Sequence, residues 1–162
     1  MTPQELYALA HSLFEYKDGN LVRKVNRRKA KAGDPATYNG GRYMRVRLNG
    51  KAEQAHRIIF LMHHGYLPEV VDHIDGDAFN NRIENLREAT QQQNCLNRRL
   101  RSDNSCKVPN VFWHKDHGKY SVQVSVDGKQ KHVGYYDNLK AASIVAHEAR
   151  QKHYGNFAYK GA

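Results

Sequence analysis

The chain of 162 residues has few cysteines and fewer acidic than basic side chains, and it lacks a long apolar run. Its two cysteines, Cys95 and Cys106, are too few for a disulfide scaffold or a four-thiolate zinc site. No apolar run reaches the roughly 18 residues that a membrane-spanning helix needs. The N-terminal segment also lacks the basic start and apolar stretch of a secretory signal. We therefore expect a reduced, soluble, intracellular protein with no membrane partner.

Acidic residues are scarce and unevenly placed. Against 26 lysines and arginines stand 16 acids, which gives a net charge of +10 and favours a polyanionic partner. Residues 1–50 carry ten basic and four acidic side chains, and residues 101–162 carry ten and five. Residues 51–100 carry six and seven, so the carboxylates gather between two basic arms. Carboxylates repel phosphate, but at least one is needed where a divalent cation is held against phosphate.

The first 100 residues are predicted to form short helices and antiparallel strands. Thr2, Pro3 and Glu5 make a good helix start, and apolar spacing extends that helix to about Tyr16, before a break at residues 18–20. Strands are expected over residues 21–25, 42–48 and 51–55, over 70–71 leading into Asp72, and over 86–89. Helices are expected over residues 56–64 and after the capping residue Thr90.

The last third shows a different pattern. Residues 101–109 gather turn-forming residues and predict a linker. Alternation of apolar and polar side chains predicts strands over residues 110–114, 119–126 and 130–136. Asn138 is expected to cap a helix that runs to about Tyr154. This order predicts a three-stranded antiparallel sheet followed by one helix.

The candidate chemistry lies in residues 71–97, which read VDHIDGDAFNNRIENLREATQQQNCLN. The order strand, loop, strand, helix allows Asp72, His73 and Asn94 to converge. A histidine titrates near neutral pH and suits a general base. One carboxylate and one amide oxygen suit hydrated Mg²⁺ or Mn²⁺, completed by a substrate phosphate. Taken singly, each residue is explained by a turn cap or a solvated helix face, but the ordered combination predicts phosphodiester hydrolysis.

That combination resembles the HNH endonuclease family, in particular its phage homing and nicking branch, and the DHIDGD, NNRIENL and QQQN stretches carry the likeness. The resemblance implies that His73 is the general base and that Asp72 is a metal ligand. It implies that Asn94 is the helix-borne ligand in place of the family's last histidine, which argues against tight zinc binding. Asn85 matches the middle asparagine, which orients the catalytic histidine.

The HNH resemblance covers roughly residues 13–103 and implies an α+β fold. We expect an HNH domain over residues 1–103 whose ββα-metal core occupies about residues 69–100, with an N-terminal helix and small antiparallel strands around it. His56 lies in an Ala-His-Arg triplet that also matches the family's pattern, and we expect it to pack within a helix.

Residues 104–162 form the second predicted domain. Over roughly residues 106–160 the GKY, VGYYDN and HYGNFA stretches resemble the ethylene-response-factor (Apetala-type) DNA-binding domain. The resemblance implies a sheet that lies in the major groove of double-stranded DNA, braced by a helix. The predicted sheet face has no arginine, so modest sequence specificity is expected. Tyr120, Tyr135 and Tyr136 are assigned largely to the core.

Candidate DNA contacts share a basic or polar side chain, or an aromatic ring, on a predicted outward face. They are Arg27, Arg28, Lys29 and Lys31 of a basic loop, Arg45 and Arg47 on one strand face, Asn97 and Arg98 on the helix face of Asn94, Trp113 and Lys115 near a turn, and Lys119, Ser121, Gln123, Ser125, Gln130 and His132 on the C-terminal sheet.

The sequence therefore predicts a metal-dependent DNA endonuclease of the homing or nicking type, without a small-molecule cofactor. If it is phage-encoded, as the resemblance implies, its place is the cytoplasm of a bacterial host. It is expected to act as a monomer or a homodimer. The alternative is a catalytically inactive, sequence-specific DNA-binding regulator. An RNA-binding or zinc-ribbon protein is disfavoured because no paired CxxC occurs.

Overall fold

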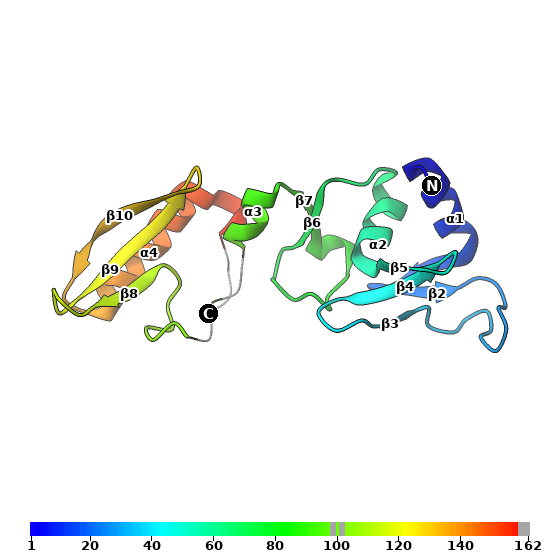
Figure 1. The fold of residues 1–162 in the computed structure, drawn as a ribbon, viewed down its shortest axis with the longest axis horizontal. Coiled ribbons are helices and arrows are strands. Elements are labelled where there is room, and N and C mark those ends of the chain that lie inside the picture. The colour runs from blue at the N-terminus through cyan, green and yellow to red at the C-terminus, as the bar shows by residue number, and fades with distance from the viewer. Residues whose placement is uncertain (98–99, 101–102, 159–162) are drawn as a thin grey trace. The chain divides into compact units, whose positions relative to one another are not determined.

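The structure is a computed structural model that describes residues 1–97, 100 and 103–158. The chain divides into two compact units, Met1–Thr90 and Gln91–Ala162. Helices and small antiparallel sheets make up both units, so the predicted α+β class is confirmed (Figure 1). Within the described ranges, no helix has both the length and the apolar character needed to cross a membrane.

The first unit consists of helices and three small antiparallel sheets, with strand orders β1-β2, β3-β4-β5 and β6-β7. In chain order its elements are α1 (Pro3–Leu13), β1 (Phe14–Lys17), β2 (Asn20–Arg23), β3 (Thr37–Asn39), β4 (Met44–Leu48), β5 (Lys51–Gln54), α2 (Ala55–His64), β6 (Val70–His73), the short 3₁₀ helix η1 (Ile83–Asn85) and β7 (Leu86–Ala89).

The start of α1 is as predicted, but its end is not. The hydroxyl of Thr2 accepts from the backbone N–H of Glu5, and the Glu5 carboxylate accepts from the N–H of Thr2, which completes a capping box. The helix stops before Tyr16, which lies instead in β1, paired with β2. Asp18 and Gly19 have φ values of 45° and 83°, so they form a hairpin turn rather than a helix stop.

Helix α2 is the centre of the first unit. It contacts α1, β2, β4, β5, β6, β7 and η1. Ile58, Ile59 and Leu61 are fully buried on it, and it ends at Gly65 in the left-handed region with a φ of 76°. A helix that is apolar on nearly every side must be enclosed by other elements. The surrounding strands are therefore held in place by their packing on α2.

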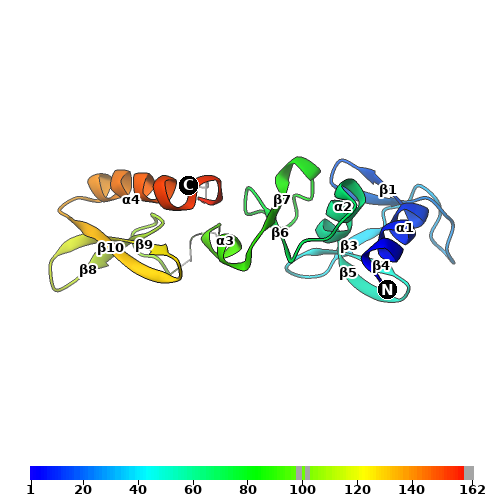
Figure 2. The same ribbon diagram turned by 90° about the horizontal axis from the view of Figure 1, so that it is seen from above.

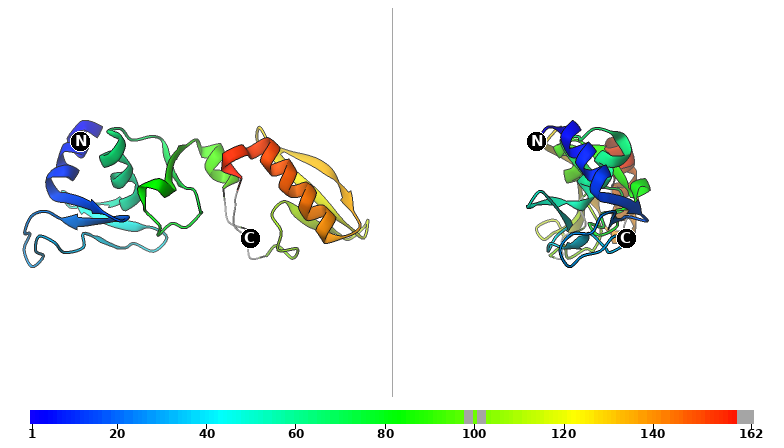
Figure 3. Two further views of the ribbon diagram at one scale, coloured as in Figure 1. Left: turned by 180° about the vertical axis from the view of Figure 1, so that it is seen from behind. Right: turned by 90° about the vertical axis from the view of Figure 1, so that its right-hand side faces the viewer.

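The second unit consists of one sheet and its helices. In chain order its elements are α3 (Gln91–Leu96), β8 (Val111–His114), β9 (Lys119–Val126), β10 (Lys129–Tyr136), α4 (Leu139–Tyr154) and the 3₁₀ helix η2 (Gly155–Phe157). The strand order is β10-β9-β8 and all pairs are antiparallel. Figures 2 and 3 show α4 running along one face of this sheet. The predicted cap is present, because Asn138 accepts from the N–H of Ala141 at 2.8 Å.

Small side chains hold α4 close to the sheet. Ala142 and Ala146 are fully buried against a cluster that contains Val111 and Val122. A second cluster contains Val124 of β9, Ala149 and Tyr154, and Leu96 of α3 packs against it. Alanines on the helix let its backbone approach the strands, so the unit builds its core from little apolar material.

The predicted boundary and linker need correction. We expected the first domain to end at residue 103 and residues 101–109 to be a linker. Leu96 instead packs on the core of the second unit, which places α3 there. Cys106 is buried in the same unit, and the Asn104 amide donates to the carbonyls of Val108 and Val111. Residues 103–109 therefore belong to the second unit, while 101–102 lie outside the described residues.

Ile59→Ala is expected to destabilise the first unit alone. Removing a fully buried isoleucine should lower its free energy of unfolding by about 2–5 kcal/mol, through lost burial and a cavity. The second unit has separate core clusters, so its unfolding should not change. Urea unfolding followed by far-UV circular dichroism reports on both units, and fluorescence of the single tryptophan, Trp113, reports on the second.

The matched control for this test is Ile144→Ala. Ile144 is 53% exposed, so its truncation should change stability by less than about 0.5 kcal/mol. A parallel shift of both signals in Ile59→Ala would mean that the two units unfold as one.

Candidate active site

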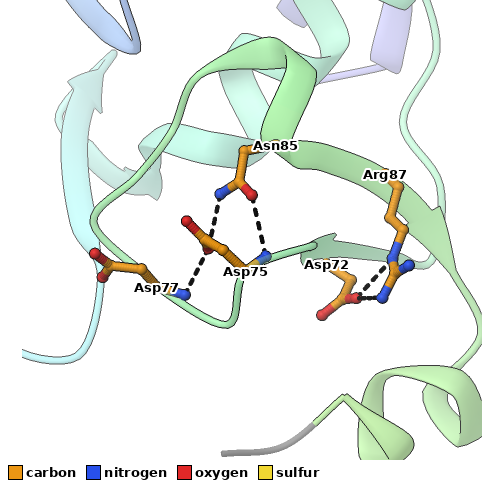
Figure 4. Close-up of polar contacts among 5 residues, drawn as sticks. All are labelled: Asp72, Asp75, Asp77, Asn85 and Arg87. Atoms are coloured by element: carbon orange, nitrogen blue, oxygen red, sulfur yellow. Dashed lines mark hydrogen bonds and ion pairs between the residues drawn. The ribbon is translucent and has the colours of Figure 1, made fainter. Parts of the chain in front are cut away.

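Strands β6 and β7 bring Asp72 and Arg87 together. Their antiparallel register places Arg87 directly opposite Asp72, and Leu86 opposite His73. Nε and Nη2 of Arg87 donate to Oδ2 of Asp72 at 2.9 and 2.8 Å, as Figure 4 shows. These side chains are only 15% and 6% exposed, so the ion pair is largely shielded from water. Successive residues of a strand point to opposite faces, so Asp72 and His73 project from opposite sides of the hairpin.

The ring of His73 is held on several sides. Its Nε2 lies 2.9 Å from Oδ1 of Asn81, and both side chains are buried. The ring of His56 meets it edge-on at a centroid distance of 4.8 Å, and the ring of Tyr43 is stacked at 6.4 Å. An amide oxygen beside Nε2 favours the tautomer that carries its proton there. In a neutral ring this leaves the lone pair on Nδ1.

His56 is a buried neutral histidine. It lies in the first turn of α2, as expected, and is only 4% exposed. Burial, followed by the nearby charges of His73 and Arg57, lowers the pKa of His56 from 6.5 to about 3. The positive end of the helix dipole acts in the same direction. Its Nδ1 has no hydrogen-bond partner among the described residues. At neutral pH, His56 therefore adds no charge beside His73.

The loop between β6 and β7 is organised around Asp75. Its carboxylate accepts from the N–H of Asp77 at 2.7 Å, from the Asn80 amide at 2.7 Å and from the Asn85 amide at 2.9 Å. The Asn85 oxygen accepts in return from the N–H of Asp75 at 3.1 Å (Figure 4). Partial burial raises the pKa of Asp75, but these hydrogen bonds outweigh it and leave the pKa below its usual value.

Asn85 holds the loop that follows His73, and the orienting role predicted for it stays a prediction. Its amide donates to Asp75 and to the backbone carbonyl of Asn80, so Asn85 fixes the loop. The side chain that meets the His73 ring is Asn81, which sequence reasoning missed. The Asn-Asn pair at 80–81 was visible in the sequence only as part of a loop, and nothing in its spacing indicated which asparagine turns inward.

Ligands for a metal ion are sparse within the described residues. No group of three or more histidine, cysteine, aspartate or glutamate side chains there is arranged to hold a metal. The ligand set predicted from the sequence has only two protein residues, so waters and a phosphate would have to complete the shell of a hard cation. Asp72 has carboxylate oxygens, one of which accepts from Arg87, and its role as a metal ligand stays a prediction. Asn94 lies on α3 in the second unit, half-buried, and its role as a ligand stays a prediction.

The candidate DNA contacts of the first unit are exposed. Arg27, Arg28, Lys29 and Lys31 are all on the surface of the loop between β2 and β3. Arg45 and Arg47 face outward from β4 while Val46 and Leu48 are buried, as the alternation predicted. The Arg47 guanidinium lies 5.8 Å from the ring centre of Tyr38. These basic side chains are accessible to a polyanion.

Two candidates of the second unit are buried, which corrects the prediction. Asn97 is 4% exposed and Ser121 is 1% exposed, so neither side chain is accessible to DNA. Ser121 is short and sits between Phe112 and Tyr135, its cross-strand neighbours, whose larger rings rise above it. Tyr135 is itself 41% exposed, so its assignment to the core was wrong.

The remaining candidates of the second unit fall into two groups. Exposed are Trp113, Lys115, Gln130 and His132, and half-buried are Lys119, Gln123 and Ser125. Arg98 lies outside the described residues. Trp113 pairs with Tyr120 across the strands and meets its ring at 4.9 Å, which puts it on the opposite sheet face from Ser121.

Comparisons with known proteins bear on this geometry. A family model described as HNH endonuclease matches residues 53–96, which include Asp72, His73, Asn85 and Asn94. The chain is also 28% identical over 110 residues to Protein 3.8 of Escherichia phage T7, which covers 67% of this chain and 90% of the phage protein. No solved structure gives a significant match. These findings support an HNH-type protein related to a phage protein, with a ββα core in the matched segment.

The neutral state of His56 predicts a pH dependence of stability. Because its pKa is about 3 when folded and 6.5 when unfolded, the unfolded chain binds more protons between these values. Stability should therefore fall as the pH is lowered through this window, by at most about 1.4 kcal/mol per pH unit from this group. His56→Leu should show a shallower fall in urea unfolding measured between pH 7 and pH 4.

His147→Leu is the matched control, since His147 is exposed on α4 in the other unit. An equally steep fall in wild type and His56→Leu would show that other groups cause the acid sensitivity.

Proposed function

We propose that the chain is a metal-dependent DNA endonuclease of the HNH type that hydrolyses phosphodiester bonds, as a homing or nicking enzyme. The observation that carries this proposal is the buried His73, held by Asn81 on Nε2 and adjacent to Asp72. Both residues lie within the segment that matches the HNH endonuclease model. The hydrogen bond at Nε2 sets the tautomer, and the tautomer decides at which nitrogen a general base accepts its proton.

His73 acts in this proposal through Nδ1. With its Nε2–H donated to the Asn81 oxygen, the neutral ring accepts a proton from an attacking water at Nδ1. His56 and Tyr43 limit rotation of the ring by contact. Asp75 and Asn85 set the path of the loop that carries Asn81. Each of these residues positions the base and none of them needs to touch the phosphate.

Asp72 and Asn94 are proposed to hold a divalent cation, Mg²⁺ or Mn²⁺. When bound, such a cation stabilises negative charge on the phosphate and on the leaving oxygen. The donors proposed are oxygen atoms only, which suit a hard cation rather than zinc. Arg87 donates two hydrogen bonds to the Asp72 carboxylate, so a bound cation would share this carboxylate with Arg87.

Double-stranded DNA is the proposed substrate. The loop with Arg27, Arg28 and Lys29 and the outward face of β4 offer positive charge on the unit that holds His73. The second unit is proposed to add further contacts to DNA, as the Apetala-type resemblance implies. Contacts to phosphate give affinity with little sequence information, so selectivity must come from other contacts.

His73→Ala tests the proposed chemistry. Supercoiled plasmid is incubated with the full chain and Mg²⁺, and nicked and linear products are quantified over time. Wild type should cut, and His73→Ala should cut about 10²–10⁴-fold more slowly with little change in DNA affinity, because only the proton transfer is lost. Asn81→Ala should fall between the two, because it frees the ring without removing it.

No cleavage by wild type with either Mg²⁺ or Mn²⁺, together with tight DNA binding, would favour the alternative of a DNA-binding regulator. Undiminished cleavage by His73→Ala would place the base elsewhere.

Asp72→Asn tests the metal ligand. Loss of the charge should raise the metal concentration that gives half-maximal cleavage, and a chelator should abolish cleavage in every variant. The matched control is Arg87→Gln, which removes the other half of the ion pair but no proposed ligand. It should not raise the metal requirement. Thermal melting of both variants corrects for loss of a largely buried pair, and equal metal requirements in both would exclude Asp72 as a ligand.

A further inference from the structure

The sheet of the second unit has a face that α4 does not cover. In an antiparallel sheet, directly paired residues share a face. Val122 is buried toward α4 and pairs with Val111, so the neighbouring Ser121, with its partners Phe112 and Tyr135, belongs to the other face. Phe112 is 48% exposed and Tyr135 is 41% exposed. Two large rings therefore stand open to solvent on either side of a buried serine.

Imidazole rings enlarge this aromatic surface around Tyr135. The ring centres of His132 and His117 lie 4.5 and 4.6 Å from that of Tyr135, and that of His114 lies 5.4 Å away in an edge-on arrangement. Nδ1 of His114 has no hydrogen-bond partner among the described residues. Strands β8 and β10 and the turn after β8 thus contribute a connected group of rings around Tyr135.

The charge of this face does not oppose a polyanion. Its residues in the fully described strands β8, β9 and β10 include no carboxylate. Lys119 lies at one end of the face, paired with Asp137 at 3.0 Å, an exposed and therefore weak ion pair. In the adjoining turn Lys115 and Asp116 are both exposed, so their charges balance. A nucleic-acid backbone can pass along this edge without meeting a negative side chain on the face itself.

Rings and short side chains fit unpaired bases better than the edges of a duplex. Reading the major groove relies most often on arginine or lysine reaching guanine, or on an amide reaching adenine. This face has no arginine, and the Gln123 amide already donates to the Ser121 hydroxyl at 3.3 Å. Exposed aromatic rings on a sheet, next to positive charge, are the means by which proteins stack unpaired bases with little sequence preference.

We propose that the uncovered face of the β8–β10 sheet binds single-stranded DNA by stacking its unpaired bases on Phe112 and Tyr135. The choice of DNA rests on the proposed function. The stacking itself does not require nuclease activity. The second unit would then hold the chain at sites where strands are separated, while the basic surface of the first unit binds duplex.

The test uses the full chain with His73→Ala, in the presence of a chelator so that no strand is cut. Fluorescence anisotropy measures affinity for a labelled single strand, for its duplex and for an RNA of the same sequence. Phe112→Leu and Tyr135→Leu should each weaken binding to the single strand on the order of tenfold and leave duplex binding within about twofold. Tyr135→Phe, which keeps the ring, should bind as the parent does.

Ile144→Ala is the surface control, because it removes an exposed apolar side chain from α4 rather than from the sheet face. Melting temperatures verify that each variant is folded. Equal losses on duplex and single strand, a larger loss on RNA than on DNA, or no loss in either leucine variant would each overturn the proposal. None of these measurements depends on cleavage, so failure of the nuclease assay and failure of this binding assay are read separately.

Discussion

Helix α2 is enclosed by α1 and by strands from all three sheets of the first unit, and this enclosure sets the positions of the candidate catalytic groups. The helix has to be buried because its apolar residues face every direction. His56 is carried into the interior with them and comes to lie against His73. Its neutrality is therefore a consequence of packing. His56 is thus both a core residue and the neighbour of the proposed general base, His73. Because His56 is neutral, it places no second positive charge beside that ring.

The β6–β7 hairpin holds two acidic side chains, Asp72 and Asp75, in fixed positions within a basic protein. Asp72 is largely buried and paired with Arg87, while Asp75 is tied into the loop by three hydrogen bonds. The hydrogen bonds to Asp75 lower the pKa of its carboxyl group, and the ion pair with Arg87 orients the Asp72 carboxylate. Asp75 and Asp77 hold the loop in shape, and Asp72 is the carboxylate proposed as a metal ligand.

The second unit is built with little core. Alanines bring α4 against the sheet, and the Tyr154 hydroxyl accepts from the N–H of Ser125, in the central strand β9, at 2.7 Å. Because the helix covers one face only, the rings on the other face remain at the surface. Exposed aromatic rings are unfavourable in water, and surfaces of this kind commonly mark binding sites.

The sequence by itself determined the α+β class, most strand positions, the caps at Thr2 and Asn138, and the outward direction of Arg45 and Arg47. These follow from local signals that need only neighbouring residues: turn dipeptides, alternation and capping. Even so, Asp18-Gly19 was interpreted as a helix stop, because a turn between two strands is recognisable only once the second strand is known to pair. The same local rules pointed to Asp72 and His73.

Tertiary structure alone decided which side chains meet across the chain. That Asn81 rather than Asn85 contacts His73, and that His56 lies beside it, depends on how a loop and a helix pack. Alternation predicted that Ser121 faces away from α4, but not that Phe112 and Tyr135 bury it from either side. Leu96 likewise joins the second unit through contacts far along the sequence. Whether a side chain is buried depends on the neighbours that folding brings to it. The periodicity of a single segment does not specify those neighbours.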